Sequence, residues 1–147
     1  MSKVVCLAAM LLGLPTTAQV AVDGDTIKLN GATYRLWGID APESKQACSD
    51  GWPAGWLAAT RMQALISGRP LVCLEKDKDR YGRALAICRA GGEDVAAILV
   101  REGLAWAFLR YSSDYVAQEA RAKGEKLGVH AHGCELAWEW RAQQRPR

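Results

Sequence analysis

An Asn-Gly pair at positions 30 and 31 is the sequence feature that most restricts how this chain can fold. It separates two runs rich in strand-forming residues, Thr26–Leu29 and Ala32–Leu36. Both central residues of the tightest hairpin turns take a positive φ, which Asn and Gly adopt readily. The pair therefore predicts a β-hairpin, with Arg35 inside its second strand.

Apolar spacing and turn residues predict the other elements of the fold. Helices are expected over Ala54–Ile66, over Asp94–Glu102, and from about Asp114 to Leu127 with Ser112 or Ser113 as its cap. Strands are expected over Pro70–Leu74 and Arg83–Arg89, on either side of a charged turn. Residues 20–29 are strand-like with an interruption at Asp23-Gly24-Asp25, which adds a strand before the hairpin. The order is then three strands, one helix, two strands and two helices. It predicts an α+β protein, mainly a five-stranded Greek-key barrel of the OB type with about three α-helices.

The first 18 residues have the pattern of an export signal. Lys3 precedes the apolar run Val4–Leu14, and small residues follow Pro15. We expect a signal peptide over residues 1–18 and one domain with a short tail over residues 19–147, in the periplasm or secreted. The alternative is a buried first strand or helix. The chain has no run of about 18 apolar residues, so no ordinary membrane-spanning helix is predicted after cleavage.

Cysteine usage supports the export prediction. Removal of the signal takes away Cys6 and leaves an even set of four cysteines. The midpoint between Cys73 and Cys88 falls in the charged turn, so the two face each other across the predicted hairpin and can form a disulfide. The alternative is a pair of small buried apolar residues. If Cys73 and Cys88 are bonded, Cys48 is expected to pair with Cys134.

Three charged segments carry more charge than the fold requires. The first is Asp23-Gly24-Asp25, which alone indicates a turn. The second is Arg35 followed by Asp40 and Glu43, where a structural ion pair is the alternative. The third is Asp79–Arg83, which alone indicates a solvated turn. The net charge of +3 neither indicates nor excludes a nucleic-acid substrate.

Taken together, these segments hold the groups that phosphodiester hydrolysis requires. Asp25 and Asp40 are hard oxygen ligands of the kind that calcium takes, and the Ala41 carbonyl precedes Pro42 in extended backbone. Arg35 and Arg83 can bind phosphate oxygens in a bidentate manner. Glu43 can then accept a proton from water.

Three motifs of this sequence resemble the signature segments of the thermonuclease family, the staphylococcal-nuclease-like domains. They are Val22–Thr26, Arg35–Glu43 and Asp79–Arg83, and the similarity continues through Leu99–Ala105. The resemblance implies a five-stranded OB barrel with three helices. It also implies a calcium-dependent endonuclease that cleaves DNA and RNA and leaves 3′-phosphates. The expected cofactor is Ca²⁺, the expected partners are DNA and RNA, and the expected state is a monomer.

The same resemblance implies roles for individual residues. Asp25, Asp40 and Ala41 would hold calcium, Arg35 and Arg83 would bind the attacked phosphate, and Glu43 would act on the water. Tyr81 would lie beside the nucleotide phosphate, and Tyr111 would line the nucleotide pocket. Leu109 stands where the staphylococcal enzyme has a second pocket tyrosine, and the turn before Tyr81 is shorter.

Alternatives to this interpretation remain open at the level of the sequence. A non-catalytic OB module that binds nucleic acid is the second hypothesis. A zinc site built from His130, His132 and Cys134 is a third. In the tail, Trp138 and Trp140 either fasten the chain near Cys48 or stack on nucleic acid. The arginines of the tail either contact phosphate or are solvated; they are Arg141, Arg145 and Arg147.

Overall fold

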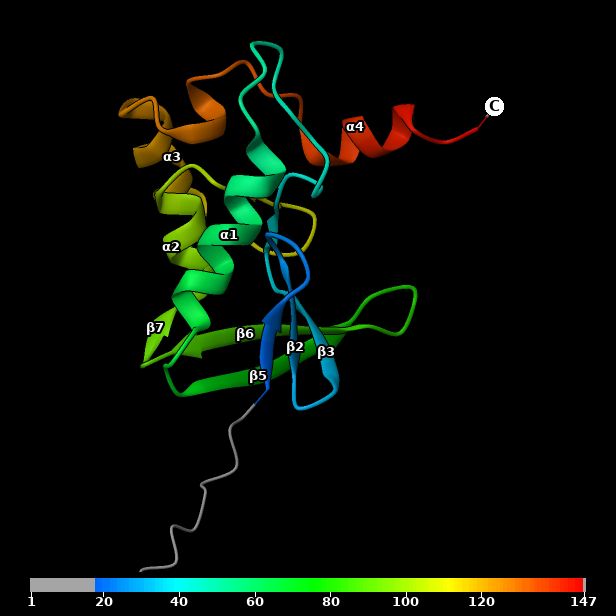
Figure 1. Ribbon diagram of the computed structural model, residues 1–147, viewed down its shortest axis with the longest axis vertical. Coiled ribbons are helices and arrows are strands. Elements are labelled where there is room, and N and C mark those ends of the chain that lie inside the picture. Colours follow the sequence, from blue (N-terminus) through cyan, green and yellow to red (C-terminus); the bar gives the residue numbers. More distant parts are fainter. Residues whose placement is uncertain (1–17, 147) are drawn as a thin grey trace, which may run out of the picture.

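A computed structural model describes residues 18–146 of the chain, with a mixed sheet and four α-helices (Figure 1). The strands are β1 (Gln19–Ala21), β2 (Thr26–Leu29), β3 (Ala32–Leu36), β4 (Ile39–Asp40), β5 (Leu71–Lys78), β6 (Ala84–Ala90), β7 (Glu93–Asp94) and β8 (Trp106–Ala107). The helices are α1 (Ala54–Ile66), α2 (Val95–Arg101), α3 (Val116–Gly124) and α4 (Ala137–Gln143), with a 3₁₀ turn at Gly128–His130. The predicted α+β class is confirmed.

The sheet runs in the order β1-β2-β3-β6-β5, with β7 beside β6. All its pairs are antiparallel except that between β3 and β6. Within the described residues no pairing joins β5 to β1, so the sheet is barrel-like but not closed. A separate pair, β4 with β8, carries Asp40 opposite Trp106.

The Asn-Gly hairpin has the predicted form. Asn30 and Gly31 both have positive φ, 49° and 86°, and join β2 to β3. In this register Arg35 pairs with Thr26 on β2 and with Leu85 on β6. Arg35 is therefore held by strands on both sides, at the centre of the sheet.

The main core lies between the sheet and helices α1 and α2. It is built from Ile27 and Leu36 of the sheet, Met62 and Ile66 of α1, and Leu99 of α2 among others. A second, smaller cluster joins the loop after β4 to the C-terminal segment. Its members are Cys48, Trp52, Ala54, Trp106, Val129, Cys134, Leu136, Ala137 and Trp138. Trp138 therefore fastens the tail to the domain, as one of the two interpretations of the sequence held.

Several boundaries differ from those expected. The third predicted helix is shorter at both ends and starts after Tyr115, with no side-chain cap. Ser112 instead accepts a hydrogen bond from the Asp114 N–H, within the turn before the helix. Strand β5 extends to Lys78, four residues beyond the predicted end. Helix α4 was not predicted, and neither were the two-residue strands β4, β7 and β8.

The predicted signal peptide covers residues 1–18. All of it except Ala18 lies outside the described residues. Within residues 18–146 no helix is long and apolar enough to cross a lipid bilayer. The structure joins Cys73 to Cys88 directly across the β5–β6 pair, and Cys48 to Cys134.

Gly55 fixes the loop that carries Glu43 against the start of α1. A Cβ atom at this position would lie 1.7 Å from the Glu43 carbonyl oxygen. We predict that Gly55→Ala destabilises the fold by about 2–3 kcal/mol, because backbone atoms must move apart. Urea unfolding measures this effect. Gly124→Ala is the control, because no atom lies within 4 Å of its added Cβ. Equal stability of Gly55→Ala and wild type would contradict the prediction.

Candidate active site

The centre of the site is Arg35 between two buried carboxylates. Its Nη2 atom lies 2.9 Å from Asp25 Oδ2 and 2.6 Å from Asp40 Oδ1. The two aspartates are 3% and 0% exposed. Asp25 also accepts hydrogen bonds from the Ala41 N–H at 3.0 Å and the Thr26 hydroxyl at 3.1 Å. Two of the three charged segments singled out in the sequence thus meet at one guanidinium.

The carboxylates of this centre hold more negative charge than Arg35 balances. Burial raises the pKa of Asp25, and the charge of Asp40 raises it further, while Arg35 opposes both. Burial and the neighbouring Asp25 raise the pKa of Asp23 to about 6. Hard oxygen donors that lie close together suit a divalent cation such as calcium.

The donor set is small. Within residues 18–146 no group of three or more His, Cys, Asp and Glu side chains is arranged to hold a metal. A cation on Asp25 and Asp40 would therefore take its other ligands from backbone carbonyls and water. Ala41 lies beside Asp25 through its N–H, so its backbone is close to the two carboxylates.

The trio of His130, His132 and Cys134 is not available as a zinc site. Cys134 is bonded to Cys48 and has no free thiolate. His132 stacks on Trp52 at 4.5 Å between ring centroids, and its Nδ1 lies 2.7 Å from Asp50. His130 is half-buried, and burial lowers its pKa.

Glu43 lies in the loop after β4, with its side chain 32% exposed. Its backbone N–H donates to Gln46 Oε1 at 3.1 Å, and its carbonyl accepts from the Gln46 N–H at 2.7 Å. Gly55 packs against the same carbonyl. These contacts fix the backbone of Glu43, so that its carboxylate reaches the same cavity as Arg35.

Arg83 is oriented by Asp79, a residue whose role the sequence did not indicate. The Asp79 carboxylate accepts from the N–H groups of Tyr81 and Arg83, both at 2.9 Å, and from Arg83 Nε at 2.6 Å. Burial would raise the pKa of Asp79, but these donors outweigh it and hold the pKa below its usual value. Because Asp79 takes Nε, the terminal nitrogens of Arg83 remain available to a ligand.

Aromatic rings lie beside these cations. The guanidiniums of Arg80 and Arg83 lie 4.8 and 5.6 Å from the centre of the Tyr81 ring, which is 68% exposed. The Tyr111 ring lies 5.3 Å from Phe108. Exposed rings next to arginines suit bases and phosphates of a nucleotide.

One cavity of about 570 Å³ connects these groups. It is lined by Asp23, Arg35, Glu43, Asp79, Arg80, Tyr81, Arg83, Phe108, Arg110, Tyr111, Trp138, Arg141 and Arg145. Every side chain predicted to act in catalysis or substrate binding lines it. Asp25 and Asp40 lie beneath it, in contact with Arg35.

Arg141 is the site residue that sequence reasoning missed. It lies on α4, and its two terminal nitrogens contact Asp40 and Glu43. Burial disfavours its charge, but Asp40 and Glu43 raise the pKa of Arg141 above its ordinary value. The basic tail was visible in the sequence, but no signal showed that a helix would turn one of its arginines inward.

Known proteins are similar in sequence to this chain. Residues 33–132 match the family model described as "Staphylococcal nuclease homologue". The micrococcal nuclease of Shigella flexneri is 36% identical over 138 residues, which cover 82% of this chain and 76% of that protein. The SPbeta prophage-derived endonuclease YokF of Bacillus subtilis (strain 168) is 39% identical over 77% of this chain and 43% of its own length. The staphylococcal-like nuclease CAN1 of Arabidopsis thaliana is 32% identical over 76% and 33%.

The chain thus falls in the class of hydrolytic nucleases. It belongs to the staphylococcal nuclease family, whose model matches more than half of its length. It spans less than half of the second and third relatives named above.

The raised pKa of Asp23 yields a test of how burial and Asp25 act on this carboxylate. Protonated Asp23 stabilises the folded state, and this contribution is lost as pH rises through about 6. Asp23→Asn should therefore stabilise the metal-free protein at pH 8 by about 1–2 kcal/mol, after allowance for partial exposure, with little gain at pH 4.

Urea unfolding in chelator at both pH values measures the difference. Asp77→Asn, on an exposed residue of β5, is the control. An equal effect of Asp23→Asn on the free energy of unfolding at pH 4 and pH 8 would show that the pKa of Asp23 is not raised in the folded protein.

Proposed function

We propose that this protein is a calcium-dependent endonuclease that hydrolyses phosphodiester bonds of DNA and RNA and leaves 3′-phosphates. The observation that carries the proposal is the buried pair Asp25 and Asp40 around Arg35, beneath a cavity that Glu43 and Arg83 also reach. A module that only binds nucleic acid has no need of buried carboxylates, which are costly to bury.

Each residue has a defined task in this proposal. Asp25, Asp40 and the Ala41 carbonyl hold calcium, which supplies positive charge beside the attacked phosphate. The two aspartates form ion pairs with the Nη2 atom of Arg35. The other nitrogens of the Arg35 guanidinium can face a phosphate in the cavity. Arg83, held at Nε by Asp79, offers its terminal nitrogens to the same phosphate. The two arginines stabilise the charge that grows on the phosphoryl oxygens.

Glu43 is the proposed base. A water oxygen bonds to phosphorus while the bond from phosphorus to O5′ breaks, and the phosphate stays on the 3′ side. Glu43 takes one proton from the attacking water, and solvent supplies a proton to O5′. Tyr81 and Tyr111 are proposed to contact the nucleotide, because their rings line the cavity and are partly exposed.

We also propose that the protein works outside the cytoplasm, as a monomer, after removal of residues 1–18. Its disulfides support this proposal, because such bonds persist in oxidising compartments.

Metal dependence is tested by digestion of circular plasmid and of RNA with calcium or with chelator. We expect cleavage of both in calcium and none in chelator. The product ends should require phosphatase treatment before a polymerase can extend them, because a 3′-phosphate blocks extension. Equal cleavage in chelator, or no cleavage by folded protein in calcium, would reject the proposal.

Arg83 offers the cleanest test of the catalytic assignment, because its side chain is 42% exposed and its loss leaves the core intact. Arg83→Ala should lower kcat by about 10²–10³-fold, as expected for loss of a transition-state contact. Lys78→Ala, an exposed change at the end of β5 outside the cavity, should leave kcat unchanged. Normal turnover of Arg83→Ala would remove Arg83 from the mechanism.

A further inference from the structure

Arg141 binds the two acidic residues to which the proposed function gives the most important tasks. Its Nη2 lies 2.8 Å from Asp40 Oδ2, and its Nη1 lies 3.1 Å from Asp40 Oδ1. The same Nη1 lies 2.7 Å from Glu43 Oε1. The guanidinium therefore contacts both oxygens of Asp40 and bridges Asp40 to Glu43.

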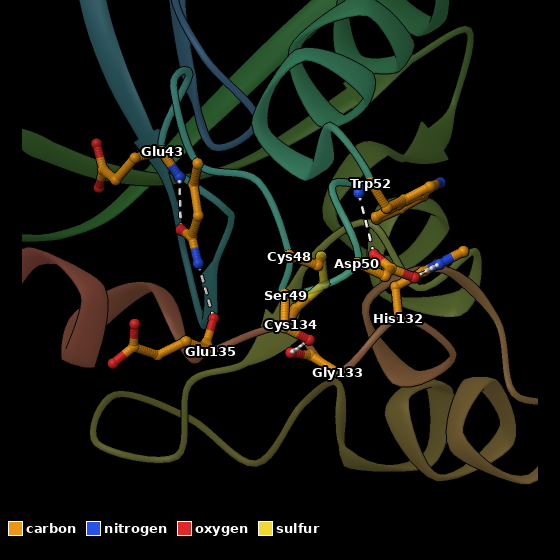
Figure 2. Close-up of a disulfide and its surroundings, with 10 residues drawn as sticks. Glu43, Cys48, Ser49, Asp50, Trp52, His132, Gly133, Cys134 and Glu135 are labelled. Carbon is orange, nitrogen blue, oxygen red and sulfur yellow. Dashed lines mark hydrogen bonds and ion pairs between the residues drawn. A yellow bond between two sulfur atoms is a disulfide. The ribbon is translucent and has the colours of Figure 1, made fainter.

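The C-terminal segment before α4 is anchored to the loop that follows Glu43 (Figure 2). The Cys48–Cys134 disulfide joins the two segments covalently. The Gln46 side chain accepts from the Glu43 N–H and donates to the Glu135 carbonyl at 2.7 Å. Ser49 donates to the Gly133 carbonyl at 3.3 Å, and His132 contacts Asp50. The helix that carries Arg141 therefore starts from a fixed point beside the site.

Arg35 and Arg141 contact Asp40 in different ways. Arg35 belongs to the central strand β3, is 15% exposed, and touches only Oδ1 of Asp40 while it also binds Asp25. Arg141 lies on a seven-residue helix near the C-terminus, is 33% exposed, and occupies both oxygens. Of the two cations, Arg141 is the one that can leave without disturbing the sheet.

A divalent cation on Asp40 needs the oxygens that Arg141 holds. Each carboxylate oxygen has few acceptor sites, and Oδ1 already accepts from Arg35 as well as from Arg141. The positive charge of Arg141 would also repel a cation placed this close. A metal ion therefore cannot bind Asp40 while Arg141 contacts both of its carboxylate oxygens.

We propose that Arg141 competes with the metal ion for Asp40, so that this arginine sets the calcium affinity of the site. Without metal, Arg141 is paired with Asp40 and Glu43. Binding of the cation displaces Arg141 from Asp40 into the cavity that it already lines. This inference rests on the proposed function, because it takes Asp40 as a ligand of calcium.

The test is calorimetric titration of calcium into the full-length protein, without nucleic acid, for wild type and Arg141→Gln. Loss of the competing charge should tighten calcium binding about tenfold or more. Arg145→Gln is the matched control. Arg145 lines the same cavity, but among the described residues it makes no ion pair, so its loss should change the affinity less than threefold.

Arg141→Lys gives a second variant, because one ammonium group keeps the charge but cannot hold both oxygens of Asp40. Its affinity should lie between those of wild type and Arg141→Gln, and it serves alone if Arg141→Gln fails to fold. Affinity equal to or weaker than wild type in the folded variants would overturn the competition while the calcium site stands. Absence of calcium binding in every variant would overturn both the competition and the proposed calcium site. Binding by Arg141→Gln with none by wild type would support the competition most strongly.

Discussion

The site depends on one buried interaction, the Arg35 guanidinium between Asp25 and Asp40. Charges at this depth are stable only when paired and hydrogen-bonded. The sheet supplies the geometry, because the Asn30–Gly31 turn fixes the β2–β3 register and the parallel β3–β6 pair covers the other side of Arg35. Burial raises the pKa of Asp25 and the charge of Asp40 raises it further, while Arg35 opposes both. A second cation beside these carboxylates would stabilise their charged forms.

The walls around this centre have separate origins. One wall is the β5–β6 hairpin, which the Cys73–Cys88 disulfide crosslinks. The turn of this hairpin carries Tyr81 and Arg83, and hydrogen bonds to Asp79 orient Arg83. The other is the C-terminal segment, clamped by Cys48–Cys134, which brings Trp138 and Arg141 to the cavity. Each disulfide thus ties down one of the segments that complete the site. In the absence of metal, Arg141 takes the role of the second cation.

Local signals in the sequence were sufficient for much of this arrangement. Turn chemistry at Asn30-Gly31 predicted the hairpin, and helical spacing predicted α1 with its observed bounds. The midpoint of Cys73 and Cys88 predicted their register across β5 and β6. The motifs named the residues that gather around the cavity, although their roles stay predictions.

The features that were missed depend on tertiary contacts. Helix α4 has seven residues and no side-chain cap, and its Ala137 and Trp138 belong to a cluster with residues far away in sequence, Cys48, Trp52, Ala54 and Trp106. Strands β4 and β8 have two residues each and exist only as partners of one another. The inward turn of Arg141 follows from that cluster, and the role of Asp79 follows from the geometry of a turn. Neither has a local sequence signature.

A crystal structure of the full-length protein with calcium would test the central claim most directly. We predict calcium bonded to carboxylate oxygens of Asp25 and Asp40, with Arg35 still between them and Arg141 withdrawn from Asp40. Calcium bound elsewhere, with Arg141 still on both oxygens of Asp40, would contradict it.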